Sequence, residues 1–358
     1  MSTIKFSGNS SAFYSDLKHR VNNYFQEKRI STHGDYRSLV KVIVLMTLFL
    51  GIYPVLAFHI LPGAWSLLAC IVLGLVTALI GFNIMHDGAH GSLSKKPLVN
   101  KLAALSLNML GASSFLWNIK HNVIHHSFTN VDDHDDDILN EPFFRMTKRQ
   151  PKLGAHKYQH LYFPLAYGLM YVSWVFFLDF KKYFQRRISH RGDIKLTVSQ
   201  HIGFWATKLT YIFLFVILPL QFYSLPAYLL GYFIYTFTTG LVTSVVFQLA
   251  HTVEETDFLY PESESSEVYV IPTDWATHQV RTTANFATRN KFVTWAVGGL
   301  NFQVEHHLFP KIAHVHYPAL SKIVKEVCQK YNLPYHEQAT VRGAIVSHIR
   351  FLKDMGRS

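Results

Sequence analysis

Uncharged runs constrain this chain more than any other feature of its sequence. Residues 42–60 and 64–85 contain no Asp, Glu, Lys or Arg, and each run is long enough to cross about 30 Å of hydrocarbon as a helix. A further uncharged region, residues 209–250, contains Pro219, Gln221 and Pro226 near its middle, where a tight turn would separate two spans. The sequence therefore predicts an all-α integral membrane protein with four transmembrane helices in two hairpins, at about residues 42–60, 64–85, 205–220 and 227–250.

The distribution of positive charge predicts how these spans are oriented. All 34 Lys and Arg lie on one side of the predicted bundle, and the two short turns on the other side have none. Because such residues are enriched in cytoplasmic loops, we expect both termini and the long middle loop in the cytoplasm. We interpret residues 1–358 as a single domain in which residues 86–204 and 251–358 form a cytosolic helical cap. The net charge of +11 suits an anionic lipid surface or a phosphate-bearing substrate equally well, and no motif favours nucleic acid as a partner.

A fifth apolar stretch, Leu161 to Leu178, is also as long as a span. Lys157 precedes this stretch and four basic residues follow it closely, so both flanks favour the cytoplasmic side. Pro164 and Gly168 weaken it as a straight helix. We therefore interpret it as interfacial or re-entrant. If it crossed the membrane, the histidines that follow it would lie in the opposite compartment from those that precede it.

Histidines are clustered beside the ends of the apolar runs. In a helix, residues four positions apart share a face, so His86 and His90 can point at one centre. His121 and His125 repeat this spacing, and His126 adds a third ring on the adjacent flank. Three imidazoles within six residues at a membrane edge are difficult to explain as packing. Metal ligation explains them better.

A third cluster combines Gln303 with His306 and His307, again at the spacing of one helical face. Neutral imidazole suits iron, zinc or copper, whereas a neutral amide is a poor ligand. We therefore expect His306 and His307 to bind metal, and Gln303 to coordinate weakly or to make an outer-shell hydrogen bond. His251 ends the fourth predicted span, where a single histidine can be a ligand or a helix cap.

The number of clustered histidines indicates more than one metal ion. A structural zinc takes four ligands and a catalytic zinc about three, so eight histidines suit two ions with an open position on each. The only cysteines, Cys70 and Cys328, match no zinc pattern, and a site made almost wholly of imidazole fits iron and oxygen chemistry better than structural zinc. The predicted ligands are His86, His90, His121, His125, His126, His251, His306 and His307.

Other polar residues lie close to these clusters. Asp87 and Glu305 are candidate acceptors for the N–H groups of ligand imidazoles, although they could equally be surface residues. His278 is a further outer-shell candidate. The acidic run of residues 132–137 could bind a cation, but we expect it to be a solvated loop.

The three clusters together resemble the histidine boxes of the membrane-bound fatty acid desaturase family. They read His86-x-x-x-His90, His121-x-x-x-His125-His126 and Gln303-x-x-His306-His307. A third box that begins with glutamine is similar to that of front-end acyl desaturases, and sphingolipid desaturases of the same branch share it. The resemblance covers roughly residues 39–320 and extends to Phe247-Gln-Leu-Ala-His251, Trp275-Ala-Thr-His-Gln279 and His307-Leu-Phe-Pro310.

The resemblance implies an oxidoreductase that uses O2 and two electrons to introduce a cis double bond into an acyl-CoA or acyl-lipid chain. It also implies two iron ions held by the box histidines. The His-Pro-Gly-Gly motif of a fused cytochrome b5 domain does not occur in the sequence. We therefore expect a separate electron donor, either a ferredoxin, a flavin-dependent reductase or cytochrome b5, and favour a bacterial inner membrane over the endoplasmic reticulum. The alternatives are a membrane di-iron lipid hydroxylase, a sphingolipid desaturase and, without redox chemistry, a zinc-dependent membrane lipid hydrolase or a metal carrier.

Overall fold

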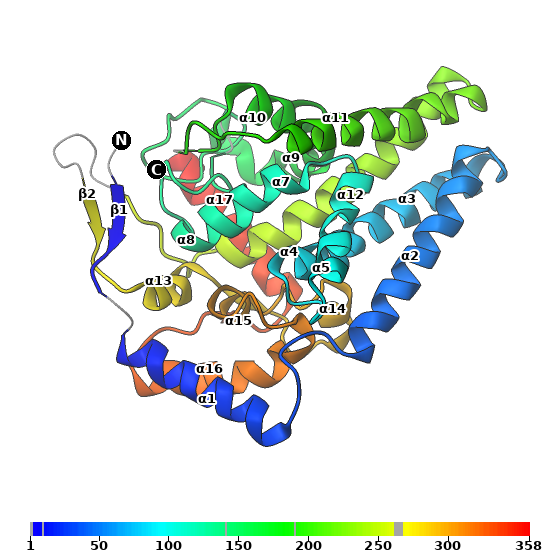
Figure 1. The fold of residues 1–358 in the computed structure, drawn as a ribbon. Coiled ribbons are helices and arrows are strands. Elements are labelled where there is room, and N and C mark those ends of the chain that lie inside the picture. Colours follow the sequence, from blue (N-terminus) through cyan, green and yellow to red (C-terminus); the bar gives the residue numbers. More distant parts are fainter. Residues whose placement is uncertain (1–2, 9–10, 140–141, 190, 261–267) are drawn as a thin grey trace.

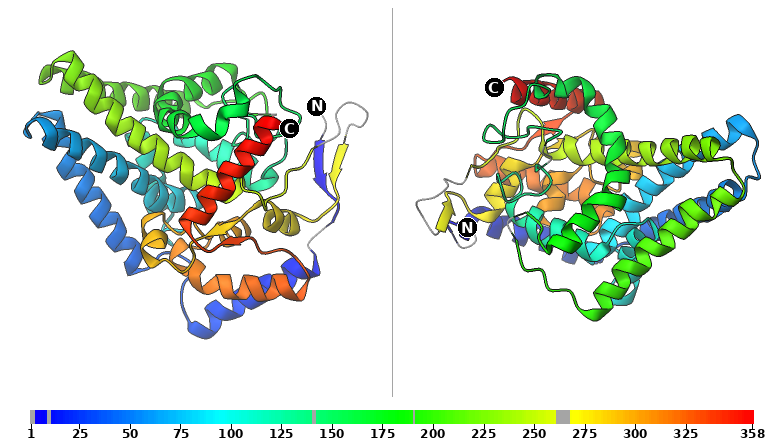
Figure 2. Two further views of the ribbon diagram at one scale, coloured as in Figure 1. Left: turned by 180° about the vertical axis from the view of Figure 1, so that it is seen from behind. Right: turned by 90° about the horizontal axis from the view of Figure 1, so that it is seen from above.

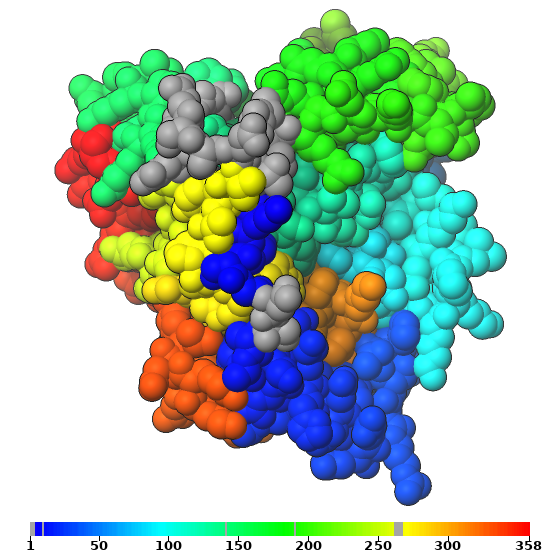
Figure 3. All heavy atoms as spheres, turned by 60° about the vertical axis from the view of Figure 1, so that its left-hand side comes forward, coloured from blue at the N-terminus to red at the C-terminus, as the bar shows by residue number. Residues whose placement is uncertain are grey.

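The computed structural model describes the chain except residues 1–2, 9–10, 140–141, 190 and 261–267 (Figure 1). The described part is mainly helical, as the sequence predicts. Its strands are short and form two parallel pairs: β1 (Thr3–Phe6) with β2 (Val268–Ile271), and β3 (Asn285–Phe286) with β4 (Glu337–Gln338). Figure 3 shows β1 in blue beside β2 in yellow on one face of the molecule.

Two long helical hairpins extend from the body of the protein (Figures 1 and 2). The first consists of α2 (Tyr36–Ala57) and α3 (Gly63–Ile80), and α3 continues through the π-helical turn η1 (Gly81–Met85) into α4 (His86–His90). The second consists of α11 (Val198–Ile212), the π-helical η5 (Phe213–Ile217), the 3-10 turn η6 (Pro219–Gln221) and α12 (Leu225–His251). These hairpins coincide with the uncharged runs of the sequence.

The tips of the two hairpins lie against each other at the end of the molecule that is far from α4. The ring of Phe58 lies 5.2 Å from that of Phe222, and the ring of His59 lies 4.1 Å from that of Tyr223, measured between centroids. Along the shafts, α12 packs on α3 and α2 packs on α3. The outward face of α2 carries exposed apolar residues such as Ile43 and Leu50, as expected of a surface that contacts lipid.

Among the described residues, five helical segments are long and apolar enough to cross a membrane, one more than the four spans predicted from the sequence. The additional segment contains η3 (His156–Tyr158), α9 (Gln159–Ser173), η4 (Trp174–Leu178) and α10 (Asp179–Gln185). A bent pair, residues 97–109 with 114–128, passes the same test only when its two halves are combined across a bend of 114°. The five segments are Tyr36–Ala57, Gly63–His90, His156–Gln185, Val198–Gln221 and Leu225–His251.

The additional segment crosses the flank of the second hairpin. Near its middle, α9 approaches α12 so closely that a Cβ atom at Gly240 would lie 2.5 Å from the carbonyl oxygen of Gly168. Less than one turn later, the hydroxyl of Tyr171 lies 3.3 Å from that of Tyr235, near the middle of α12. Beyond η4 the helix continues as α10 and reaches α11, where Asp179 pairs with Lys208.

A cap of shorter helices closes the end opposite the hairpin tips. The helix α1 packs on α16, and α17 packs against α9. The remaining helices of the described chain are α1 (Ala12–Lys28), α5 (Pro97–Ala104), α6 (Ser106–Met109), α7 (Ser114–Asn118), η2 (Ile119–His125), α8 (His126–Phe128), α13 (Trp275–Thr282), α14 (Lys291–Ala296), α15 (Gln303–Leu308), η7 (His314–His316), α16 (Tyr317–Lys330) and α17 (Val341–Arg357).

The ion pair between Asp179 and Lys208 anchors the additional segment to α11. Both side chains are buried, and Lys208 Nζ lies 2.8 Å from Asp179 Oδ2. The ammonium also donates to the carbonyl oxygens of Gly111 and Val175, at 2.7 and 2.8 Å, while the carboxylate accepts from the backbone N–H of Ser113. Every charge in this cluster is therefore paired, which a low-dielectric environment requires.

We expect Lys208→Met to lower the free energy of unfolding by about 3–5 kcal/mol, because the substitution leaves the buried carboxylate of Asp179 without its counter-ion. Denaturation of the purified protein in detergent measures this loss. The matched control is Lys195→Met, since Lys195 is exposed and its loss is expected to change stability by less than about 0.5 kcal/mol. Equal stability of the two variants would contradict the role assigned to the ion pair.

Candidate metal centre

The ends of several helices bring the eight predicted ligands together at the base of the hairpins. His86 and His90 lie on α4, the continuation of α3, and His251 is the last residue of α12. The middle box lies on η2 and the first residue of α8, and the third box lies on α15. All eight are buried except His90, which is half-buried. Helices far apart in the sequence therefore contribute to one centre.

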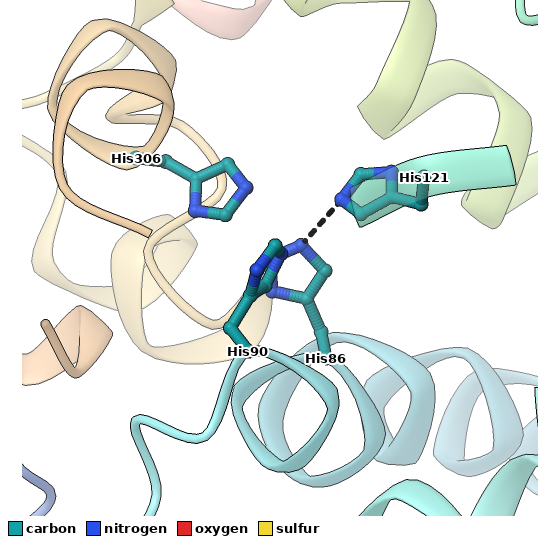
Figure 4. A group of neighbouring side chains, drawn as sticks. All are labelled: His86, His90, His121 and His306. Atoms are coloured by element: carbon teal, nitrogen blue, oxygen red, sulfur yellow. Dashed lines mark hydrogen bonds between the residues drawn. The ribbon is translucent and has the colours of Figure 1, made fainter. Parts of the chain in front are cut away.

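The ring nitrogens of the described residues form four overlapping groups, and two of these groups share no residue. Nitrogens of His86, His90, His121 and His306 lie within 4.8 Å of one another, and Figure 4 shows the four rings converging from three directions. The second group consists of His125, His251 and His307, and their nitrogens also lie within 4.8 Å of one another.

His126 connects the two groups, because its ring forms a further set with His306 and His307. The second and third boxes are therefore divided between the groups. His121 belongs to the first and His125 to the second, and the two residues also form a fourth set with Asp137. Their rings stack with centroids 5.2 Å apart, as their spacing of four residues suggested.

Several ring nitrogens in these groups are buried and have no hydrogen-bond partner among the described residues. They include Nε2 of His90, His125, His306 and His307, and Nδ1 of His126. Leaving a buried polar atom unpaired costs about 1–3 kcal/mol each. A protein that accumulates such atoms at one place has arranged them for a ligand that the polypeptide does not supply.

The opposite nitrogen of three rings is held by a protein group. His125 Nδ1 lies 3.0 Å from Asp135 Oδ2, and His307 Nδ1 lies 2.7 Å from Gln279 Oε1. His306 Nδ1 lies 3.1 Å from the hydroxyl of Tyr317. Partners of this kind fix the orientation of a ligand imidazole and direct its other nitrogen at the metal.

The rings of the third box are neutral. Burial, and then the neighbouring imidazoles, hold the pKa of His306 and His307 well below the usual range. The neutral form has the free lone pair that binds a metal ion. The donor set therefore fits a transition metal such as iron, zinc or copper.

The prediction of a solvated loop for the acidic run is wrong. Asp135 is fully buried, and its carboxylate accepts from His125 and from the backbone N–H groups of Asn130 and Asp137. Asp137 lies 3.2 Å from His125 Nδ1 and pairs with Lys120 at 2.6 Å. The loop folds back on η2, so the carboxylates of Asp135 and Asp137 face the ring of His125, which lies ten and twelve residues earlier in the sequence.

Asp87 and Glu305 are buried, but their hydrogen bonds do not go to the predicted ligands. Asp87 Oδ2 pairs with His314 Nδ1 at 2.7 Å. The carboxylate of Glu305 accepts from Asn285 and Tyr335, both at 2.8 Å, and burial raises its pKa to about 7. Each acid is adjacent in sequence to a predicted ligand, so on a helix it points about 100° away from that ligand. This geometry explains why neither carboxylate supports the neighbouring ring.

His278 and Gln303 are also buried near the centre. The ring of His278 lies 5.5 Å from that of Phe6, outside the groups of converging nitrogens, and burial lowers the pKa of His278 to about 4. Gln303 Oε1 has no hydrogen-bond partner among the described residues. An outer-shell role for His278, and an outer-shell or ligand role for Gln303, remain predictions.

Sequence reasoning missed four residues that support the rings, namely Asp135, Gln279, Tyr317 and Trp117. The ring of Trp117 stacks on that of His121, with centroids 4.4 Å apart. Trp117 and Asp135 are close to the middle box in sequence, so proximity was an available signal for both. Gln279 and Tyr317 come from α13 and α16, and only the fold brings them to the third box.

Comparison with known proteins identifies the family. The sequence model for fatty acid desaturases matches residues 62–339. This chain belongs to the fatty acid desaturase family. The desaturase is accordingly an oxidoreductase that acts on fatty acyl chains, as the resemblance of the three boxes implied.

Its relatives in cyanobacteria, plants and amoebae have related names. The sn-1 linoleoyl-lipid 6-desaturase of Synechocystis sp. is 35% identical over 348 residues, which cover 96% of the desaturase and 95% of the relative. The acyl-lipid (8-3)-desaturase of Physcomitrium patens is also 35% identical, over 96% of the desaturase and 72% of the relative. A probable Delta(5) fatty acid desaturase of Dictyostelium discoideum is 32% identical, over 97% and 77%.

Proposed function

We propose that this chain is a front-end acyl-lipid desaturase. It introduces a cis double bond between an existing double bond and the carboxyl end of a fatty acyl chain, and the chain is attached to a membrane lipid. The observation that carries the proposal is the pair of buried imidazole groups, whose unpartnered nitrogens converge at the base of the hairpins. The names of the relatives support the front-end position and the acyl-lipid substrate.

The proposed cofactor is a pair of iron ions. One ion is assigned to His86, His90, His121 and His306, and the other to His125, His251 and His307, with His126 between them. Bound iron would supply the redox chemistry that activates O2 for removal of two hydrogens from the acyl chain. Neutral imidazoles suit iron, and the separation into two groups suits two ions.

The contribution of the protein is orientation and exclusion of water. Asp135, Gln279 and Tyr317 hold the Nδ1 atoms, so that the Nε2 atoms stay directed inward without a rearrangement when metal binds. Apolar rings surround the centre: Trp117 lies 6.0 Å from His86, and Phe247 lies 6.2 Å from His121. Such walls favour a hydrocarbon chain over water. They can hold the chain in one pose, which determines the carbons that react.

We further propose that four of the five apolar segments cross the membrane. Histidines that precede the segment Leu161 to Leu178 and histidines that follow it meet in one centre, so both ends of this segment must lie on the same side. Its contacts support an interfacial course, because it is a helix without a sharp bend that lies across α12 at Tyr235 and then across α11 at Phe204. The positive charge then favours a cytoplasmic centre and cytoplasmic termini.

On this topology, residues 1–358 form one domain with spans at about residues 42–60, 64–85, 205–220 and 227–250. The cap consists of residues 86–204 and 251–358. A bacterial inner membrane fits the cyanobacterial source of a relative. Electrons would come from a separate ferredoxin, flavin reductase or cytochrome b5, and the basic cap would attract an acidic carrier at low salt.

The product of the reaction tests the proposed function. Expression in a host that makes di-unsaturated fatty acids, together with a reductant protein, is expected to yield acyl chains that are lighter by two hydrogens. The new double bond is expected on the carboxyl side of the existing ones, and it should appear first in intact membrane lipids. Mass spectrometry of the lipids and of the free acyl-CoA pool makes both measurements.

A gain of one oxygen atom would identify a hydroxylase instead and contradict the proposal. Appearance of the new double bond first in acyl-CoA would contradict the acyl-lipid substrate while leaving desaturation intact. The His125→Ala variant, which is expected to be inactive, gives the background signal for both measurements.

A further inference from the structure

A cavity of about 430 Å³ lies between the two hairpins, toward the tips and away from the histidines. Its walls come from α2, α3, η5 and α12. It extends from His59 and Tyr223 at the hairpin tips to Cys70 and Tyr235 deeper in the bundle. Its volume lies within the range of about 300–1,000 Å³ that is typical of ligand sites.

The walls of this cavity offer almost only hydrocarbon and ring faces, although tyrosines, Ser66 and His59 contribute to them. The hydroxyl of Ser66 donates to the carbonyl of Leu61 at 2.6 Å, and His59 Nδ1 lies 3.2 Å from the carbonyl oxygen of Phe222 at the hairpin tips. The hydroxyls of Tyr53 and Tyr228 donate to the backbone carbonyls of Leu214 and Phe215, at 2.7 and 3.1 Å. The hydroxyl of Tyr223 donates to the carbonyl of Leu56 at 2.8 Å.

These polar groups are therefore occupied within the protein. In addition, residues 42–85 and 209–250 contain no charged side chain. Below the tips, where His59 lies, a ligand of this cavity meets no charged group and no free hydroxyl of these residues, which favours a hydrocarbon.

A layer of tyrosines separates the cavity from the metal centre. The hydroxyl of Tyr235 lies 3.3 Å from that of Tyr171 and 3.5 Å from that of Thr77, and all three residues are buried. Sixteen residues of α12 separate Tyr235 from His251, which corresponds to about 24 Å along the helix. The cavity is therefore distinct from the place where an acyl chain reacts.

We propose that this cavity binds the hydrocarbon tail of a bilayer lipid from the leaflet at the hairpin tips. The tips carry exposed aromatic residues, Phe58, Trp65 and Phe222, as expected of segments at the level of the lipid headgroups. A lipid whose headgroup lies there can extend one tail between the hairpins toward Cys70. The tail would fill the space between α3 and α12 and hold the two hairpins together. The inference rests on the membrane placement of the hairpins and not on the reaction.

Photo-crosslinking tests this site directly. The purified full chain is reconstituted in phosphatidylcholine whose acyl chains carry a terminal diazirine, irradiated and mapped by peptide mass spectrometry. The expected result is labelling concentrated on cavity residues, in particular Cys70 and Tyr235. Labelling should persist after metal is removed with a chelator, and excess substrate lipid should lower it no more than an equal excess of unlabelled phosphatidylcholine does.

Two matched glycine substitutions sharpen the test. Gly231 lines the cavity, where an added Cβ would lie 3.4 Å from Cys70 Sγ, so Gly231→Phe is expected to fill the space and abolish the labelling of Cys70. Gly51 is exposed on α2 and has no atom within 4 Å of an added Cβ, so Gly51→Phe should leave the labelling unchanged.

Either of two outcomes would overturn the proposal. One is labelling of the outward residues Ile43 and Leu50 as strong as that of Cys70, which would mean that the tails only surround the bundle. The other is displacement of the label by substrate lipid but not by an equal excess of unlabelled phosphatidylcholine, which would mean that the cavity belongs to the catalytic site. Both are measured on the wild-type chain, so the test does not depend on whether Gly231→Phe folds. Neither depends on turnover, so failure here is distinguishable from failure of the proposed desaturation.

Discussion

Replacement of His125 by Ala is expected to abolish turnover and to release iron from the desaturase. His125 belongs to the second group of nitrogens, and its Nε2 is one of the buried atoms without a described partner. A metal ion contributes several kcal/mol to the stabilisation of a transition state, so loss of a site lowers the rate by about 1,000-fold or more. Lipid product formed per hour and iron bound per chain are the two measurements.

The control for this substitution is His19→Ala. His19 is exposed on α1 and contacts Asn23 on the same helix, so its removal is expected to change neither measurement. Full activity of the His125→Ala variant, with wild-type iron content, would show that the residue is not a ligand. It would also contradict the assignment of a second iron ion to this group of histidines.

A substitution outside the ligand set is expected to have the next largest effect. Asp135→Asn should weaken iron binding or activity by about 10–100-fold, the usual cost of losing an outer-shell partner. The carboxylate of Asp135 accepts from the His125 ring and from two backbone N–H groups. An amide of the same size has only one accepting oxygen, so its NH2 group must face one of these donors. Competition of the protein with a chelator for iron measures the loss.

Asp133→Asn is the matched control, because Asp133 lies in the same loop but is exposed. Its substitution is expected to leave the affinity for iron unchanged. If the two variants bind iron equally well, the carboxylate of Asp135 does not orient His125, and the hydrogen bond between them has no role in metal binding.

The apolar helices and the clustered histidines could be predicted from the sequence because both depend on local patterns. A run without charged residues indicates a helix that can span a membrane, and histidines at helical spacing share a face. The distribution of the histidines among the groups could not be predicted in this way. It depends on the contact between α15 and the middle box, which no local pattern encodes.

The outer shell was less predictable than the ligands. Asp87 and Glu305 were chosen because they are adjacent to predicted ligands, and that adjacency turns them away from those rings. The residues that do support the rings lie at varied distances in the sequence. Trp117 precedes His121 by four positions, Gln279 precedes His307 by twenty-eight, and Tyr317 follows His306 by eleven. The fifth apolar segment was ambiguous for a similar reason, since hydropathy records length and composition but not the course of a helix.

Metal analysis of the active, purified chain tests the central claim most directly. The two groups of imidazoles predict about two iron ions per chain, bound by neutral nitrogen ligands. The iron content should rise and fall with desaturase activity as metal is removed and restored. A single zinc ion per chain, with activity that does not depend on iron, would contradict the claim.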